Sequence, residues 1–137
     1  MVKAENILAG FLGRLLDDRF FADVQITRAF PRTVKPTVLK NTVIAVGIQE
    51  IHIDDASIGG DVKTGFFSVF ADIFVPFSDE SATPEKFVFR ICRDTADFRI
   101  VSVRVSEIKT NSTAGCYVMR AVFTFHNEIF FGGNGDE

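Results

Sequence analysis

Apolar residues near the start of the chain recur at the spacing of one face of a helix. They are three or four positions apart: Ala4, Ile7, Leu8, Phe11, Leu12, Leu15 and Leu16. Polar or small residues occupy the opposite side, among them Lys3, Asn6, Gly13 and Asp17. The pattern predicts an amphipathic helix from about residue 3 to residue 18.

Strand-like patterns follow, separated by loop signals. Residues 20–27 alternate over a short stretch and predict a short strand, whereas residues 42–54 are rich in β-branched side chains and predict a long one. Residues 30–41 contain two prolines, which favour an extended loop. Residues 55–65 hold three glycines and two aspartates, which predict a second loop.

Residues 66–77, FFSVFADIFVPF, are apolar at nearly every position. In a strand, Phe66, Phe70 and Phe74 point to one face, and the residues between them that are apolar point to the other. A strand that is apolar on both faces must be covered on both. Helices in a small α+β domain commonly cover one face of an antiparallel sheet, so we expect the Phe66, Phe70 and Phe74 face to bind another subunit or a partner.

A second helix and a hairpin complete the chain. Thr83, Pro84 and Glu85 supply an N-cap hydroxyl, a first-turn proline and an acidic residue, so we expect a helix from residue 84 to about residue 95. Residues 98–109 and 116–127 alternate as two strands joined by a turn-rich segment. In the first of these strands the alternation predicts one buried face, made of Val101, Val103 and Val105.

This order of elements, α-β-β-β-α-β-β, lacks the alternation that builds parallel sheets. We therefore expect an α+β fold, with a mostly antiparallel sheet of four to five strands and two helices on one face. Residues 1–131 are predicted to form a single domain, followed by a flexible tail at residues 132–137.

Composition narrows the function. The chain has 137 residues, of which 47% are apolar and 24% charged, as in one globular domain. A net charge of −3 without a basic stripe argues against tight nucleic-acid binding, and no apolar segment approaches the roughly 20 residues that span a bilayer. Cys92 and Cys116 are expected to be reduced thiols. Sixteen phenylalanines, beside one tyrosine and no tryptophan, exceed what a small core needs, so we expect some rings in interfaces.

The sequence offers little chemistry. His52, Asp54 and Asp55 at a strand end are the best candidates, yet a metal needs three or four ligands, so a polar strand end is the favoured interpretation. The glycine-rich segments lack the context of a phosphate-binding loop. Four charged residues of the second helix predict a solvated face: Arg90, Arg93, Asp94 and Asp97. We predict no catalytic, cofactor-binding or metal-binding residue, and no enzymatic activity.

The segments VKPTVLKNTVIAVGIQEIHIDDASIGG and FFSVFADIFVPFSDE resemble the head-proximal tail proteins of Gram-positive phages and prophages. The features are a K-P-x-x-x-K segment, a strand entering at residues 43–47 and a strand that ends in Val-Pro-Phe: Lys35, Pro36, Lys40, Val75, Pro76 and Phe77. The resemblance covers residues 35–127 in element order. It implies a tail terminator or tail completion protein.

Such a protein forms a ring, typically a hexamer, that caps the tail tube and meets the head connector. The resemblance implies homo-oligomerisation, with tail tube, connector or sheath proteins as partners, no membrane and no specific nucleic acid, although DNA passes through the lumen. It places the protein in a virion tail or phage-tail-like particle assembled in the host cytoplasm. The candidate interface residues are Phe66, Phe70, Phe74, Lys35, Pro36 and Ile58.

Two alternatives stay open. The first alternative is another tail, baseplate or head–tail connector subunit. The second, from a different class of protein, is a small-ligand-binding α+β domain with an apolar pocket. A pocket lined by Phe66 and Phe70 together with His52 would favour the second alternative.

Overall fold

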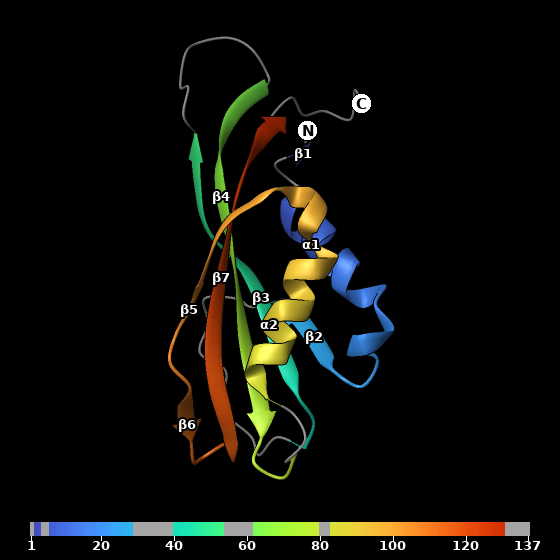
Figure 1. The fold of residues 1–137 in the computed structure, drawn as a ribbon, viewed down its shortest axis with the longest axis vertical. Coiled ribbons are helices and arrows are strands. Elements are labelled where there is room, and N and C mark those ends of the chain that lie inside the picture. Colours follow the sequence, from blue (N-terminus) through green and yellow to red (C-terminus); the bar gives the residue numbers. More distant parts are fainter. Residues whose placement is uncertain (1, 4–5, 29–39, 54–61, 80–82, 131–137) are drawn as a thin grey trace.

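The computed structural model describes residues 2–3, 6–28, 40–53, 62–79 and 83–130. The elements, in chain order, are β1 (Val2–Lys3), α1 (Ile7–Leu16), the 3-10 helix η2 (Arg19–Phe21), β2 (Gln25–Arg28), β3 (Val43–Ile53), β4 (Val62–Pro76), α2 (Pro84–Asp94), the 3-10 helix η3 (Ala96–Phe98), β5 (Ile100–Val105), β6 (Lys109–Asn111) and β7 (Cys116–Phe130). Figure 1 shows a tall sheet with the helices beside it.

One mixed sheet joins all the described strands. Its path is β1-β7-β4-β3-β2, and β5 and β6 also pair with β7. β4 is antiparallel to both β3 and β7, and it pairs with β7 along fifteen residues. Only the short end pairings are parallel, β1 with β7 and β2 with β3. The α+β class is thus confirmed, with more strands than the sequence predicted.

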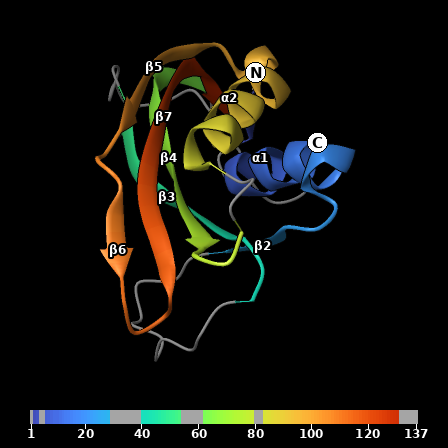
Figure 2. The same cartoon turned by 60° about the horizontal axis from the view of Figure 1, so that its bottom comes forward.

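Both helices cover the same face of the sheet, as expected (Figures 1 and 2). The core between the helices and the sheet takes every second residue of the two central strands. It is built from β4 (Phe67, Val69, Ala71, Ile73, Val75), β7 (Met119, Ala121, Phe123, Phe125) and the helices (Ile7, Phe11, Leu12, Leu15, Phe87, Val88, Ile91). The period of two along each strand and the helical stripe therefore meet in one apolar layer.

The helices differ in detail from the prediction. α1 begins at Ile7, not residue 3, because Val2 and Lys3 pair with the end of β7 as a strand. α2 begins at Pro84 with Glu85 in its first turn, as predicted. Thr83 is the N-cap by conformation, but its hydroxyl makes no capping hydrogen bond, contrary to the expectation.

The strands also shift from their predicted bounds. β4 begins at Val62, inside the segment predicted as a loop, and the predicted strand at residues 20–27 splits into η2 and β2. The single strand predicted at residues 98–109 is η3, β5 and β6, entered through Arg99 in a left-handed conformation with φ of 63°. Three of these residues separate β5 from β6, so the hairpin with β7 is interrupted.

Candidate assembly surfaces

Three of the predicted interface residues lie on the open face of the sheet, the face opposite the helices. Phe66, Phe70 and Phe74 alternate with the core residues of β4; Phe66 is 37% exposed, and the other two are half-buried. Lys35, Pro36 and Ile58 lie outside the described residues. No described helix covers this face of the sheet.

A polar row crosses the same face and shields part of it. Arg120 of β7 makes a two-pronged ion pair with Asp72 of β4, at 2.6 and 2.8 Å, and its guanidinium lies 4.3 Å from the centre of the Phe70 ring. Ser68 and Thr124 share a hydrogen bond of 3.1 Å. These contacts interrupt the apolar character of the open face, so it is less apolar than the sequence of β4 suggested.

The histidines lie closer than the sequence suggested. His52, Phe66 and His126 occupy one row across β3, β4 and β7, and the Phe66 and His126 rings are 4.6 Å apart. Asp54 and Asp55 lie outside the described residues. Among the described residues, no group of three or more His, Cys, Asp or Glu side chains could hold a metal ion.

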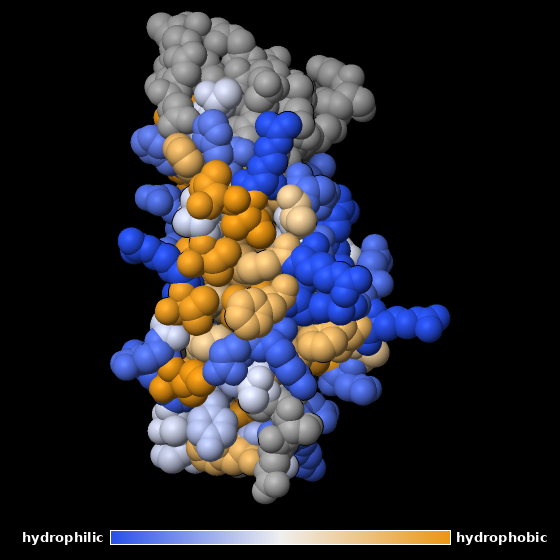
Figure 3. Space-filling view, in the orientation of Figure 1, coloured by the Kyte–Doolittle hydropathy of each residue, from blue (hydrophilic) through white to orange (hydrophobic). Residues whose placement is uncertain are grey.

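A second apolar surface, which the sequence did not indicate, follows β5 on the helix side of the molecule. Figure 3 shows apolar residues gathered over β5 and beside α2. Its most exposed members are Phe89 at 72%, Val101 at 54%, Val105 at 47% and Ile108 at 44%. Half-buried neighbours connect it to the core: Cys92, Ile100 and Val103. We call these seven residues the β5 strip.

The prediction that Val101, Val103 and Val105 form a buried face was wrong for two of the three. Only Val103 packs against the core. The pairing of β5 with β7 shifts register between Ile100 and Ser102, so Val101 bulges out. β5 lies at the sheet's edge, where α2, packed over β4 and β7, does not cover Val105.

The outer side of β5 has no strand partner among the described residues, because β5 pairs only with β7. Exposed edge strands that carry apolar side chains are templates for association with another chain. The exposed bases Arg104 and Lys109 lie on the open face of the sheet instead of beside the strip, because their partners in β7 pair in turn with Phe70 and Phe74. The β5 strip is therefore an apolar surface along a sheet edge that has no further strand partner among the described residues.

A third surface lies where α1 ends and η2 begins. Leu16 is 66% exposed and Phe20 is 37% exposed, and three exposed charged residues flank them: Asp17, Arg19 and Asp23. We call these five residues the α1 end. Figures 1 and 2 both show this end of α1 on the opposite side of the molecule from β5.

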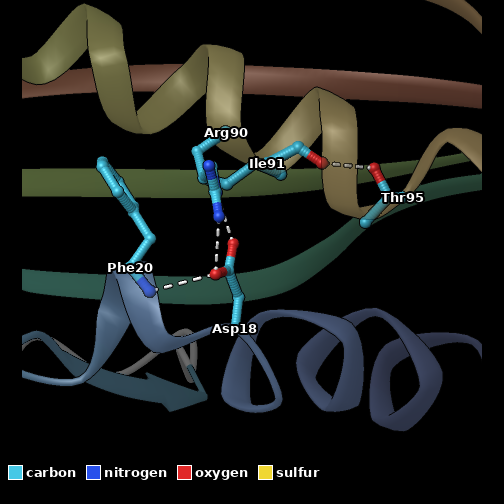
Figure 4. A network of polar contacts seen from close by, with 5 residues as sticks. All are labelled: Asp18, Phe20, Arg90, Ile91 and Thr95. Atoms are coloured by element: carbon cyan, nitrogen blue, oxygen red, sulfur yellow. Dashed lines mark hydrogen bonds and ion pairs between the residues drawn. The ribbon is translucent and has the colours of Figure 1, made fainter.

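A polar network beneath the α1 end holds it in place (Figure 4). Arg90 of α2 donates hydrogen bonds of 2.5 and 2.9 Å to the two carboxylate oxygens of Asp18. Asp18 also accepts a hydrogen bond from the backbone N–H of Phe20. The Arg90 guanidinium lies 5.0 Å from the centre of the Phe20 ring. The sequence pattern predicted that Arg90 belongs to a solvated face, and for this residue the prediction was wrong. Arg90 instead connects α2 to η2.

Asp94 adds a second acid to this network. Burial first, and then the neighbouring Asp18, raise the pKa of Asp94 to about 6. The Arg90 hydrogen bond lowers the pKa of Asp18. Asp94 Oδ2 is buried and has no hydrogen-bond donor beside it, which favours the neutral acid, because its hydroxyl can donate a hydrogen bond to the Asp18 carboxylate. The pattern of residues within α2 could not predict this pair of acids, because Asp18 and Asp94 are 76 positions apart in the chain.

A hollow of about 310 Å³ opens between η2, the start of β3 and the start of α2. Phe20, Phe87, Lys40 and Lys86 are among the residues that line it. It includes Thr42, just before the start of β3, whereas His52 lies near the other end of that strand. The hollow is therefore not the Phe66, Phe70 and His52 pocket that would favour a ligand-binding domain.

The remaining observations concern cysteines, membranes and known proteins. Cys92 and Cys116 are both free, and burial raises the pKa of each thiol. Neither α1 nor α2 has the length and apolar character that a bilayer crossing requires. A scan against protein-family models and a search of curated proteins both find no match to the chain.

Proposed function

We propose that this protein is a structural subunit that assembles with copies of itself and has no catalytic role. The observation that carries the proposal is the β5 strip, in which Val101 and Val105 of an edge strand are about half exposed and Phe89 of α2 is largely exposed. An exposed apolar surface of this kind lowers the solubility of a free monomer. Burying it against a neighbour contributes a favourable free energy of about 25 cal/mol per Å² of apolar area. Assembly supplies that cover.

The assembly we propose is a ring of about six subunits in a phage tail or phage-tail-like particle, as a tail terminator. The resemblance of residues 35–127 to head-proximal tail proteins supports this particle. Its features within the described residues are Lys40, the strand entering at residues 43–47 and the strand end Val75-Pro76-Phe77. The acidic net charge of −3 suits a lumen through which DNA passes without binding. Another tail, baseplate or connector station has the same physics.

Mass in solution tests the proposal. Light scattering behind size-exclusion chromatography, over a range of protein concentrations, should give a mass several times that of the 15.2 kDa chain. Purified tail tubes, added to the protein, should retain it at their ends. A protein that stays monomeric at high concentration and also fails to bind tail tubes would contradict assembly as its function.

The station in the particle needs a second readout. Electron microscopy of tail tubes with bound protein would show a cap at one end for a terminator. Continuous decoration or growth of the tube would instead assign the chain to the tube or baseplate.

A further inference from the structure

We propose that two copies of this protein bind β5 strip to β5 strip about a twofold axis, with their α2 helices running in opposite directions and Phe89 of each copy near the axis. The inference rests on the proposed function, self-assembly, and names one contact between copies. It follows from the charges at the two ends of the strip, which have opposite signs. A twofold contact closes at two copies, so a ring of six would consist of three such pairs joined through a second surface.

One side of α2 carries an acid, an apolar residue and a base at equal spacing. Glu85, Phe89 and Arg93 are four positions apart, so they follow one side of the helix at intervals of about 6 Å, and all three are exposed. Cys92 of the β5 strip lies on the same side, whereas Arg90 is directed toward η2. Among the described residues, no hydrogen bond or ion pair joins Glu85 or Arg93 to another side chain.

The two ends of β5 carry charges in the same arrangement. The chain passes from α2 through η3 into β5, so the C-terminal end of α2 lies beside the start of β5, and its N-terminal end lies beside the end of β5 (Figure 1). The exposed Arg99 comes just before β5, and the exposed Glu107 comes shortly after it. Arg93 and Arg99 are therefore at one end of the strip, and Glu85 and Glu107 are at the other. The strip has a basic end, an apolar middle and an acidic end.

The other charged residues near these ends belong to other contacts or surfaces. Asp97 of η3 is paired with Arg14 of α1, at 2.8 Å. The rest lie in the polar network, in the hollow and on the open face: Asp94, Lys86, Arg104 and Lys109. The basic end and the acidic end of the strip therefore keep their signs.

This distribution of charge makes the strip complementary to itself. When two strips meet with their α2 helices antiparallel, the basic end of each copy faces the acidic end of the other, and Glu85 of one copy lies opposite Arg93 of the second. Parallel helices would instead place like charges opposite each other, which opposes association. The twofold axis repeats each favourable pair. The charges therefore favour a second copy of this chain as the partner that covers the exposed valines and Phe89.

Exchanging the two charges on α2 tests the pairing. Glu85→Arg alone places bases opposite each other, and Arg93→Glu alone places acids opposite each other. We expect either change to raise the dissociation constant of self-association, measured by sedimentation over a range of concentrations, about tenfold or more. An equal mixture of the two variants should form one-to-one dimers, which native mass spectrometry identifies. A chain that carries both substitutions should associate like the unmodified protein. Both positions are exposed, so folding should be retained, which circular dichroism and thermal melting check.

The matched control is Lys109→Glu, which changes the net charge as much as Arg93→Glu does but lies on the open face. This variant should associate like the unmodified protein, and a loss of association would overturn the inference. Single variants that associate as tightly as the unmodified protein would overturn it too, as would a mixture that stays monomeric.

A milder change covers the case in which a charge reversal prevents folding. Glu85→Gln and Arg93→Gln in one chain remove both pairs and should raise the dissociation constant about threefold or more. Unchanged association of this chain would contradict the contact. An unmodified protein that never assembles would instead remove the proposed function itself, whereas assembly that ignores the charges on α2 would remove only this inference.

Discussion

Gly65 lies in β4 where the backbone of β3 comes closest. A Cβ built there would stand against the carbonyl oxygen of His52, well inside van der Waals contact, with the backbone of Ile53 next to it. Backbone atoms of a paired strand cannot rotate away as a flexible side chain can. At this position the absence of a side chain is therefore a condition for the pairing of β3 with β4.

Replacing Gly65 by alanine should lower the free energy of unfolding by about 1–3 kcal/mol, because the added methyl group forces the two strands apart. Gly13 is the matched control: it lies within α1, and a Cβ there meets no atom within 4 Å. Gly13→Ala should raise the free energy of unfolding by about 0.5–1 kcal/mol, since alanine favours the helix. Urea titrations of both variants measure the difference. Equal effects would contradict the close approach at Gly65.

The raised pKa of Asp94 predicts an unusual pH dependence of stability. Its pKa of about 6 in the folded protein lies above the ordinary value of 3.8, so folding favours the protonated form. The stability that this group contributes is complete below about pH 4 and is lost as the pH rises through about 6. Asp18 has a lowered pKa, and its contribution is lost only as the pH falls below the ordinary value.

Asp94→Asn isolates this effect. The amide cannot ionise and can donate a hydrogen bond to Asp18, as the protonated acid does. We expect the variant to match the unmodified protein near pH 4 and to exceed its stability at pH 7, measured by urea titration at each pH. A variant that is less stable than the unmodified protein at pH 7 would show that the Asp94 carboxylate is stabilising there.

The elements separate what the sequence could predict from what it could not. The apolar stripe of α1 and the alternation in β4 and β7 locate the core, because these elements bury one face over their whole length. The exposure of Val101 and Val105 was not predictable, because it depends on the bulge after Ile100 and on the edge position of β5. Alternation within a strand gives the face of each residue, whereas its burial depends on the element packed above it.

The candidate site was predictable only in part for a similar reason. The Phe66, Phe70 and Phe74 face follows from β4 alone, and the structure places it opposite the helices. The β5 strip needs α2 and β5 side by side, and the α1 end needs the contact of Arg90 with Asp18. Contacts between elements distant in the chain leave no local pattern. Phe89 is the one local indication of an exposed apolar surface, because it is a large apolar residue outside the buried stripe of α2.

Replacing Phe74 or Phe89 by aspartate distinguishes a residue needed for folding from a residue needed for assembly. Phe74 is half-buried between Val43 of β3 and Val118 of β7, so Phe74→Asp should lower the free energy of unfolding by about 1–3 kcal/mol. Phe89 is 72% exposed, so Phe89→Asp should change stability by less than about 0.5 kcal/mol while weakening self-association. Thermal melting and light scattering measure the two effects. Unchanged stability with Phe74→Asp would show that the open face is solvated.

For the whole molecule, the two helices on one face leave the subunit asymmetric. One side of the sheet is closed by α1 and α2, and the open face carries the Asp72–Arg120 pair among half-buried phenylalanines. The β5 strip and the α1 end lie at opposite edges of this layered subunit. The proposed ring would use the β5 edge for a contact between copies. The open face would then be directed to the lumen or to another component of the particle.

β7 also determines when the protein can fold during its synthesis. It is the last strand described, yet it pairs with four other strands, β1, β4, β5 and β6, and supplies Phe123 and Phe125 to the core. Until residues 116–130 have left the ribosome, β4 lacks the strand that pairs with one of its two edges. Contacts this distant in the chain form late and slowly. The nascent chain therefore exposes its most apolar strand until residues 116–130 have left the ribosome, and it depends in that interval on whatever keeps incompletely folded chains apart in the cell.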